Sequence, residues 1–180
     1  EWNLPGAWLH DQQYPQEPGR DPEACLYIQS GGVKCGAIVA VNALGDVVDV
    51  DTGKTIAGIL NEDKTDLSDT VETMLAEMSS TRNVFSGNTT IGCVVTNAKL
   101  NKTQCNKLAS IIHNGYAMAI RPVHTSFDGD TIFVMATGEV EVSPDALGAL
   151  ATQVMAKAIN RAALAAEPAY GLKAARDFAK

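Results

Sequence analysis

Apolar and polar positions change their spacing along the chain, and each change predicts an element. Two short apolar runs, Cys25–Gln29 and Cys35–Val41, flank a glycine-rich turn at residues 30–32, which is typical of neighbouring strands. Val47–Val50 follows a Gly-Asp turn and predicts another strand. Residues 71–78 then carry apolar side chains at helical spacing, which predicts a helix with one core-facing side: Val71, Met74, Leu75 and Met78.

The second half of the chain is more regular. Residues 90–96 and 131–137 are apolar runs that predict buried strands. Between them, a helix presents one apolar face, made of Cys105, Leu108, Ala109, Ile112 and Tyr116. A Ser-Pro-Asp start at 143–145 predicts the N-terminus of a last long helix, with an apolar stripe from Leu147 to Ala162. Two strand–helix units of this kind predict helices packed on a sheet, an α/β protein.

Composition places the chain among ordinary globular proteins. Its 180 residues are 46% hydrophobic and 19% charged, enough for one domain with a sizeable core. Residues 1–24 differ, because they hold four of the seven prolines and follow neither period. We expect this stretch to be an irregular arm, foreign to the fold or disordered.

Charge and cysteine usage limit the partners and the compartment. The net charge is −7, and no cluster of Lys or Arg is present, which argues against nucleic acid or an anionic membrane as partner. No signal peptide and no membrane-length apolar run is found, so a cytoplasmic protein is expected. The four cysteines form no C-x-x-C pair, which favours buried free thiols over a disulfide or metal framework.

Candidate chemistry begins where a polar loop, residues 79–88, ends at a buried strand. Thr89 stands at that entry, and a rigid strand can hold a nucleophile accurately. A threonine hydroxyl is a weak nucleophile until a base takes its proton. Breaking the Asn88–Thr89 bond would supply one, because the new α-amine has a pKa of roughly 7.7–8.0. The same hydroxyl can attack the preceding carbonyl, so cleavage and catalysis would use one atom.

Two plainer interpretations compete with this one. Asn88-Thr89-Thr90 also matches the N-glycosylation pattern, as does Asn101-Lys102-Thr103, although no secretory signal accompanies them. A threonine-rich strand entry needs no function at all. The pattern by itself favours that structural interpretation.

Three sequence segments, which occur in a fixed order, favour the functional interpretation of Thr89 over the structural one. They are GAIVAVNALGDVVDVDTGKTIAG at 36–58, GNTTIGCVVTNAKLNKTQCNKLA at 87–109 and RPVHTSFDGDTIFVMATGEV at 121–140. Together they resemble the family of L-aminopeptidase/D-esterases, β-peptidyl aminopeptidases and the nylon-oligomer hydrolase, over about residues 29–165. Three linked motifs make this a far more specific match than any short pattern.

The resemblance implies a fold and a reaction. The fold is an α/β/β/α sandwich, and the chain would cleave itself between Asn88 and Thr89, dividing residues 25–88 from residues 89–180. The family's hydrolases are N-terminal-nucleophile enzymes that form an acyl-enzyme on the new N-terminal residue and need no metal or cofactor. A small peptide or amide substrate and a homo-oligomer follow from the same resemblance.

The resemblance also implies roles for three further residues. Asn42 matches an asparagine that the family places near the nucleophile, where its amide can stabilise an oxyanion. Asp128 and Asp130 match positions that orient the nucleophile's amine and hydroxyl. The plain alternatives are a turn-forming asparagine and an Asp-Gly turn, and a metal at these two aspartates would have an incomplete oxygen cage. His124 suggests a Ser/His/Asp triad, but an N-terminal nucleophile needs no histidine, so we expect a packed or surface imidazole.

Family members are about twice as long as this chain, and most of their extra residues precede Gln29. An incomplete sandwich would leave a sheet face or edge exposed, which favours association. Two rivals to the hydrolase remain. One is an acyltransferase of similar architecture, which would pass an acetyl group to an added amino acid. The other is an inactive remnant of the family, which would stay uncleaved and inert towards peptide anilides.

Overall fold

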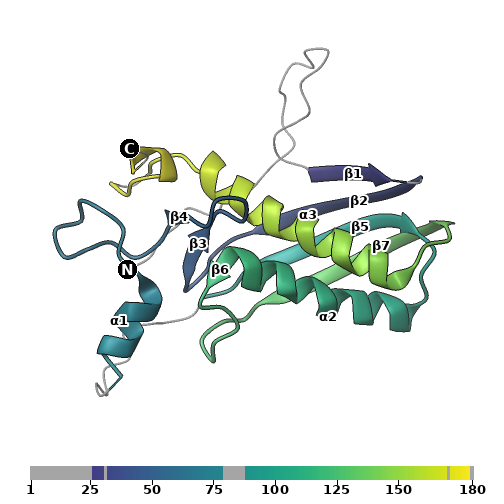
Figure 1. Cartoon of the computed structure of the whole chain (residues 1–180), viewed down its shortest axis with the longest axis horizontal. Helices are drawn as coiled ribbons and strands as arrows, with labels where there is room; N and C mark the ends of the chain where they lie inside the picture. Colours follow the sequence, from purple (N-terminus) through teal and green to yellow (C-terminus); the bar gives the residue numbers. More distant parts are fainter. Residues whose placement is uncertain (1–25, 31, 79–87, 170, 179–180) are drawn as a thin grey trace, which may run out of the picture.

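The main sheet has four strands. The structure is a computed structural model that describes residues 26–30, 32–78, 88–169 and 171–178 (Figure 1). The predicted arm at 1–24, Cys25 and most of the polar loop lie outside the described residues. The strands run in the order β1-β2-β5-β7, with β5 and β7 parallel and the other neighbours antiparallel. Their bounds are β1 Leu26–Ser30, β2 Val33–Ala40, β5 Ile91–Ala98 and β7 Thr131–Val140.

Two long helices cover one face of this sheet. Helices α2 (Lys102–Ala119) and α3 (Pro144–Ala165) lie side by side in front of the strands in Figure 1. Each begins at a capped residue: Asn101 and Gln104 form a capping box, and the Ser143 side chain accepts from the Ala146 amide. Their inward faces carry the predicted apolar residues and form the core with β2 and β5. The predicted α/β fold class is confirmed.

A small second sheet is formed by strands that lie between those of the main sheet in the sequence. It has the order β4-β3-β6, with β3 at Asp46–Val48, β4 at Thr55–Ala57 and β6 at Ile120–Arg121. The predicted strand Val47–Val50 therefore ends early, because the Asp49 carboxylate accepts from the amides of Asp51 and Thr52 and starts a turn. A short 3-10 helix, Ala175–Asp177, lies near the end of the chain.

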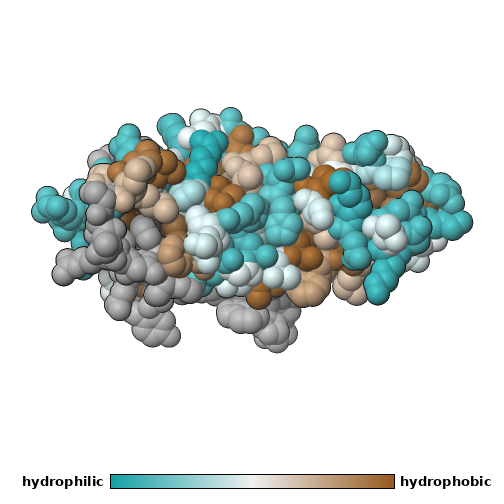
Figure 2. Space-filling view, turned by 90° about the horizontal axis from the view of Figure 1, so that it is seen from below, coloured by the Kyte–Doolittle hydropathy of each residue, from teal (hydrophilic) through white to brown (hydrophobic). Residues whose placement is uncertain are grey.

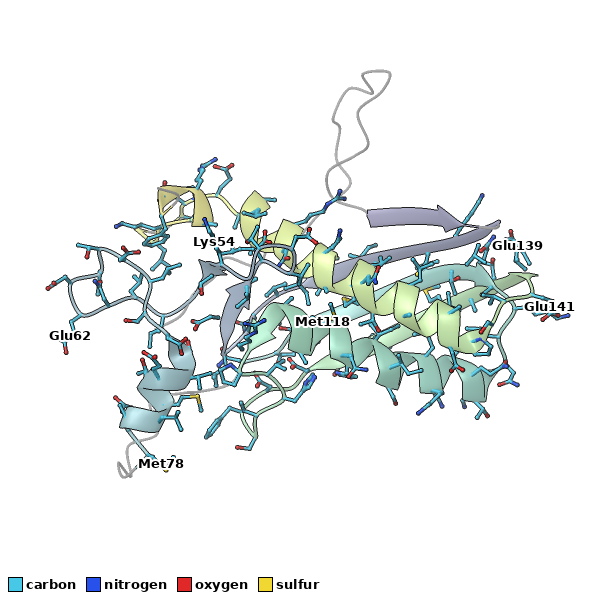
Figure 3. All side chains as sticks on the ribbon, in the orientation of Figure 1. Lys54, Glu62, Met78, Met118, Glu139 and Glu141 are labelled. Carbon is cyan, nitrogen blue, oxygen red and sulfur yellow. The ribbon has the colours of Figure 1, made fainter. Side chains whose placement is uncertain are left out.

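The helix predicted near residues 71–78 exists, but its apolar stripe is not in the core. Helix α1 spans Thr70–Ala76, whereas Val71, Leu75 and Met78 are 38%, 57% and 74% exposed. Figure 3 shows Met78 beyond the end of α1, away from the sheet. A helical period shows which side of a helix is apolar but not which element covers that side. Among the described elements, none packs extensively on the apolar side of α1. Helix α1 is held by hydrogen bonds to the buried Asp46 carboxylate, which accepts from the Thr70 amide and hydroxyl and also from the Ile59 amide.

Methionine and cysteine side chains differ in burial. Met155 is fully buried, whereas Met78, Met118 and Met135 are exposed. The three cysteines in the described part are free thiols, and burial raises the pKa of Cys35 to about 11. Among the described helices, none has the length and apolar character that a bilayer crossing requires.

The sheet face opposite the helices is apolar and open in the described residues. Adjacent strands place its exposed side chains in register, with Ile91 beside Thr131, Cys93 beside Phe133 and Val95 beside Met135. We call the exposed set the open face: Ile38, Ile91, Val95, Phe133 and Met135, between 38% and 60% exposed. Figure 2 shows the molecule from below, where apolar patches are separated by hydrophilic side chains.

Candidate active site

Thr89 lies where three segments of the chain meet. It precedes β5 at the edge where the parallel strands β5 and β7 both begin. Its amide donates to the Asn42 carbonyl at 2.9 Å. On its other side, Asn88 forms a parallel bridge with Asp128. The Asn88 amide donates to the Phe127 carbonyl at 3.2 Å, and the Gly129 amide donates to the Asn88 carbonyl at 2.9 Å. Residues 42, 88–89 and 127–129 are therefore fixed against one another.

The Thr89 hydroxyl lies on the peptide bond that precedes it. Its Oγ1 donates to the Asn88 carbonyl oxygen at 2.6 Å, and the side chain is half-buried. Gly129 passes so close that a Cβ built on it would lie 2.7 Å from this hydroxyl. That separation is shorter than real Cβ contacts, so only glycine leaves the hydroxyl where it is.

Both predicted aspartates lie beside Thr89, but neither carboxylate hydrogen-bonds its hydroxyl in the described residues. Asp130 accepts from the Thr90 amide at 2.9 Å with Oδ1 and pairs with His124 Nδ1 at 3.0 Å with Oδ2. Asp128 Oδ2 accepts from the amide and the hydroxyl of Thr125, both at 2.8 Å. In this geometry Asp130 holds the residue after Thr89, and Asp128 holds the turn that precedes Gly129.

The structure thus brings the predicted site residues, Thr89, Asn42, Asp128 and Asp130, to one end of the sheet. Asn42 contacts Thr89 through its main-chain carbonyl, and its side chain is half-buried. The catalytic roles of these residues stay predictions. The position of Thr89 at a strand entry, on which those roles depend, is what the sequence predicted.

Sequence reasoning missed a buried support behind the site. The Tyr116 hydroxyl donates to the carbonyls of Thr90 and Thr131 at 3.3 and 3.2 Å, which joins the starts of β5 and β7. Burial, with the nearby charge of Asp130, raises the pKa of Tyr116, so the phenol remains a donor. The His124 ring packs against His113 and Tyr116, with centroids 4.8 and 6.0 Å away. His124 has a φ of 59°, in the left-handed region, and its ring pairs with Asp130. A residue pattern does not reveal this backbone conformation.

His124 is therefore a packed imidazole, as expected, that also pairs with a predicted site residue. Desolvation, with the neighbouring His124, lowers the pKa of His113. In the described part of the chain, no group of three His, Cys, Asp or Glu side chains is arranged to hold a metal ion. A shallow hollow lined by Val50, Met118 and Lys157, among others, contains none of the predicted site residues.

Comparison with known proteins identifies the family of the chain. The sequence profile of peptidase family S58 matches residues 24–176. The chain belongs to this family. The predicted resemblance to the family of L-aminopeptidase/D-esterases and the nylon-oligomer hydrolase is thereby confirmed at the level of the family.

Its S58 relatives include proteins described as aminopeptidases. An uncharacterized aminopeptidase of Mycobacterium tuberculosis is 36% identical over 174 residues, which cover 86% of this chain and 50% of the relative. One from Mycobacterium leprae is 37% identical over 166 residues, or 83% of this chain and 45% of the relative. A 6-aminohexanoate-oligomer endohydrolase of Kocuria sp. is 37% identical over 90 residues, 43% of this chain and 25% of that enzyme. The chain spans about half the length of the aminopeptidases it matches.

A solved structure resembles the fold of this chain at lower sequence identity. The L-aminopeptidase D-Ala-esterase/amidase of Ochrobactrum anthropi, described as a variant of the Ntn hydrolase fold, superposes with a TM-score of 0.50 at 15% identity. The match covers 79% of this chain and 39% of that protein. At this identity the likeness concerns the fold alone.

Proposed function

We propose that this S58 chain is a self-cleaving aminopeptidase or amidase that hydrolyses small peptides or related amides through Thr89. Its membership of a peptidase family supports the hydrolase class, and relatives described as aminopeptidases and as an oligomer endohydrolase support amide bonds as the target. The single observation that carries the proposal is the position of the Thr89 hydroxyl, 2.6 Å from the carbonyl oxygen of Asn88.

Self-cleavage would begin with attack of Thr89 Oγ1 on the Asn88 carbonyl carbon. The Oγ1–carbon bond forms, the carbon–nitrogen bond to Thr89 breaks, and the hydroxyl proton ends on the released nitrogen. Water then hydrolyses the resulting ester, which leaves a carboxylate on Asn88 and restores the Thr89 hydroxyl. The reaction consumes one water and needs no other reactant.

Turnover would use the same atoms with a substrate in place of Asn88. The Thr89 amine can take the hydroxyl proton, because an α-amine with a pKa near ~7.7–8.0 is partly neutral at pH 7. The Asn42 carbonyl already accepts from this nitrogen at 2.9 Å, so it would hold the amine beside the hydroxyl. The hydroxyl oxygen attacks the carbonyl carbon of the substrate amide, the carbon–nitrogen bond breaks, and the leaving amine takes the proton from the Thr89 amine, which leaves an acyl ester on Oγ1. Water then hydrolyses this ester, which releases the acid and restores the hydroxyl.

Intact mass and N-terminal sequencing of the purified protein test the proposal. We expect two pieces, residues 1–88 and 89–180, and hydrolysis of amino-acid anilides. Thr89→Ala should remain one chain without activity, whereas Thr89→Ser should retain some of both. The adjacent threonine is a matched control: Thr90→Val removes a hydroxyl that has no partner in the described residues, so it should still cleave.

Two results would contradict the proposal. A wild-type chain that stays at 19.0 kDa and hydrolyses no anilide between mildly acidic and mildly basic pH would remove its basis. Equal cleavage in Thr89→Ala would show that another group is the nucleophile.

A further inference from the structure

The main chain of Phe127–Gly129 lies along the residue that precedes the scissile bond. We infer that this segment is the acyl-side subsite: the Gly129 amide stabilises the oxyanion, and the Phe127 carbonyl binds the free amine of an α-aminoacyl substrate. The inference rests on the proposed function and adds to it the groups that would recognise the residue to be released. It follows from how Asn88 is held in the uncleaved chain.

Asn88 pairs with this segment as one strand residue pairs with another. Its amide donates to the Phe127 carbonyl at 3.2 Å, and its carbonyl accepts from the Gly129 amide at 2.9 Å. Both polar main-chain groups of one residue are therefore satisfied by the same short segment. Asn88 itself is buried, only 8% exposed, so these bonds form with little competition from water.

Self-cleavage and substrate turnover share one chemical intermediate. In each, an acyl carbon is joined to Thr89 Oγ1 as an ester; the acyl group is that of Asn88 in the first and that of the substrate in the second. Because Oγ1 is fixed at the end of β5, the acyl group attached to it must occupy nearly the same place both times. The groups that hold Asn88 before cleavage are thus available to hold the substrate's first residue afterwards.

The Gly129 amide is directed at the atom on which charge develops. Attack on the Asn88 carbon places negative charge on the Asn88 carbonyl oxygen, which already accepts from this amide. A donor that is in place before the reaction needs no reorganisation, which is what makes such groups effective. The side-chain amide of Asn42, the oxyanion donor predicted from the sequence, would act together with it.

The Asp128 carboxylate fixes the turn that positions the Gly129 amide. Asp128 Oδ2 accepts from the amide and the hydroxyl of Thr125, and the Asp128 amide donates to the Thr125 carbonyl at 3.1 Å. These bonds fix the turn at 125–128, from which Gly129 continues. Asp128 is thereby a positioning residue, which gives the predicted aspartate a role without contact to the nucleophile.

The spacing of the two groups selects the class of substrate. In an α-aminoacyl amide, the amine and the carbonyl are separated by one carbon, as the amide and carbonyl of Asn88 are. Such a residue can reach Phe127 and Gly129 together. A β-aminoacyl amide has one more carbon, and an acyl amide without an amine has no donor for Phe127.

The first test replaces one main-chain amide by an ester. A chain joined at Cys105 from a recombinant 1–104 and a synthetic 105–180 allows glycolic acid to replace Gly129, which removes the N–H and keeps the shape. Self-cleavage is then followed by intact mass after refolding. We expect it to slow by about a hundredfold, the usual effect of losing one oxyanion donor.

A matched control carries the ester at Asp145 instead. This residue is exposed in the first turn of α3, where an amide has no intrahelical acceptor, so the control should cleave like the all-amide chain. Circular dichroism and thermal unfolding compare the folding of all three chains. Equal cleavage rates in the 129 ester and the control would overturn the role of the Gly129 amide.

The second test compares three anilides on the mature wild-type protein: alanine p-nitroanilide, β-alanine p-nitroanilide and propionyl p-nitroanilide. We expect kcat/KM for the alanine compound to exceed those of the other two by about tenfold or more, the effect of one hydrogen bond from a charged amine. Comparable hydrolysis of the propionyl compound would overturn the role of Phe127, and faster hydrolysis of the β-alanine compound would overturn the α-aminoacyl assignment.

Failure of the inference and failure of the proposed function give different results. If the all-amide chain does not divide at Asn88/Thr89, the proposed function fails. If that chain divides and the ester chain divides equally fast, only the subsite is wrong.

Discussion

At the scale of single residues, the carbonyl group of Asn88 unites the parts of the site. It accepts from the Thr89 hydroxyl and from the Gly129 amide, and both donors come from segments fixed by further bonds. Sequence motifs led to Thr89, Asn42, Asp128 and Asp130 because those side chains carry the resemblance. They could not lead to the amide of Gly129 or the carbonyl of Phe127, because every residue has such groups and only the fold gives them a direction.

A second residue-scale feature is the buried carboxylate of Asp46. Burial raises the pKa of Asp46, although hydrogen bonds from Thr70 oppose the shift. A carboxyl whose pKa is higher in the folded than in the unfolded chain adds stability below its unfolded value, near ~3.9, and this stability is lost as pH rises through the folded value. We therefore predict that the stability advantage of wild type over Asp46→Asn falls between pH 3 and pH 7.

Urea unfolding of both proteins across that range measures the difference directly. Asp63→Asn, which changes an exposed aspartate, controls for the loss of one charge. Asp46→Ala, which removes every acceptor for Thr70 and Ile59, should lower the free energy of unfolding by about 1–3 kcal/mol at neutral pH. An advantage over Asp46→Asn that grows with pH would contradict the prediction.

At the scale of elements, long periodic segments were predictable and short ones were not. The strands β2, β5 and β7 and the helices α2 and α3 were long enough to be predicted, and the inward faces of the two helices are the predicted ones. Strand β7, predicted to be buried, instead exposes Phe133 and Met135, because its apolar run does not show that only one face of the sheet is covered. Strands β4 and β6, of three and two residues, exist only because β3 lies between them, so no local pattern marks them. Helix α1 was predicted from its apolar spacing and exists, but its apolar side is not covered by other elements in the described residues.

Tyr116 connects two elements, and its hydroxyl can be removed alone. In Tyr116→Phe the carbonyls of Thr90 and Thr131 lose a buried donor, so the free energy of unfolding should fall by about 1 kcal/mol. Because Thr90 follows the proposed nucleophile, Thr89, we also expect slower self-cleavage with unchanged secondary structure. The raised pKa of Tyr116 keeps the wild-type phenol protonated, so the stability loss should be the same at pH 6 and pH 9.

Urea unfolding and a cleavage time course measure both effects. Ser110→Ala is the matched control, because it removes an exposed hydroxyl from the same helix, where Ser110 donates only to the Asn106 carbonyl. Wild-type stability and cleavage in Tyr116→Phe would show that the two strands are held together by their own ladder without the phenol.

At the scale of the whole molecule, the two faces of the main sheet differ sharply. One is covered by α2 and α3, and the other, the open face, presents a contiguous apolar surface in the described residues. Patches of this kind on soluble proteins mark surfaces of association, because covering them removes apolar area from water. The net charge of −7 opposes association only over long range and is screened by salt.

We therefore predict that this chain associates in solution through the open face. Phe133 and Met135 lie two positions apart on β7 and are 58% and 60% exposed, so Phe133→Glu with Met135→Lys places both charges on that face without changing the net charge. The wild type should show a mass that rises with concentration in sedimentation velocity, and the double variant should shift toward a single chain. Leu164→Glu, a change at a 55% exposed residue on α3, is the control and should associate like wild type. A wild-type chain that stays monomeric at every concentration, or a double variant that associates equally, would show that the open face is not the surface of association.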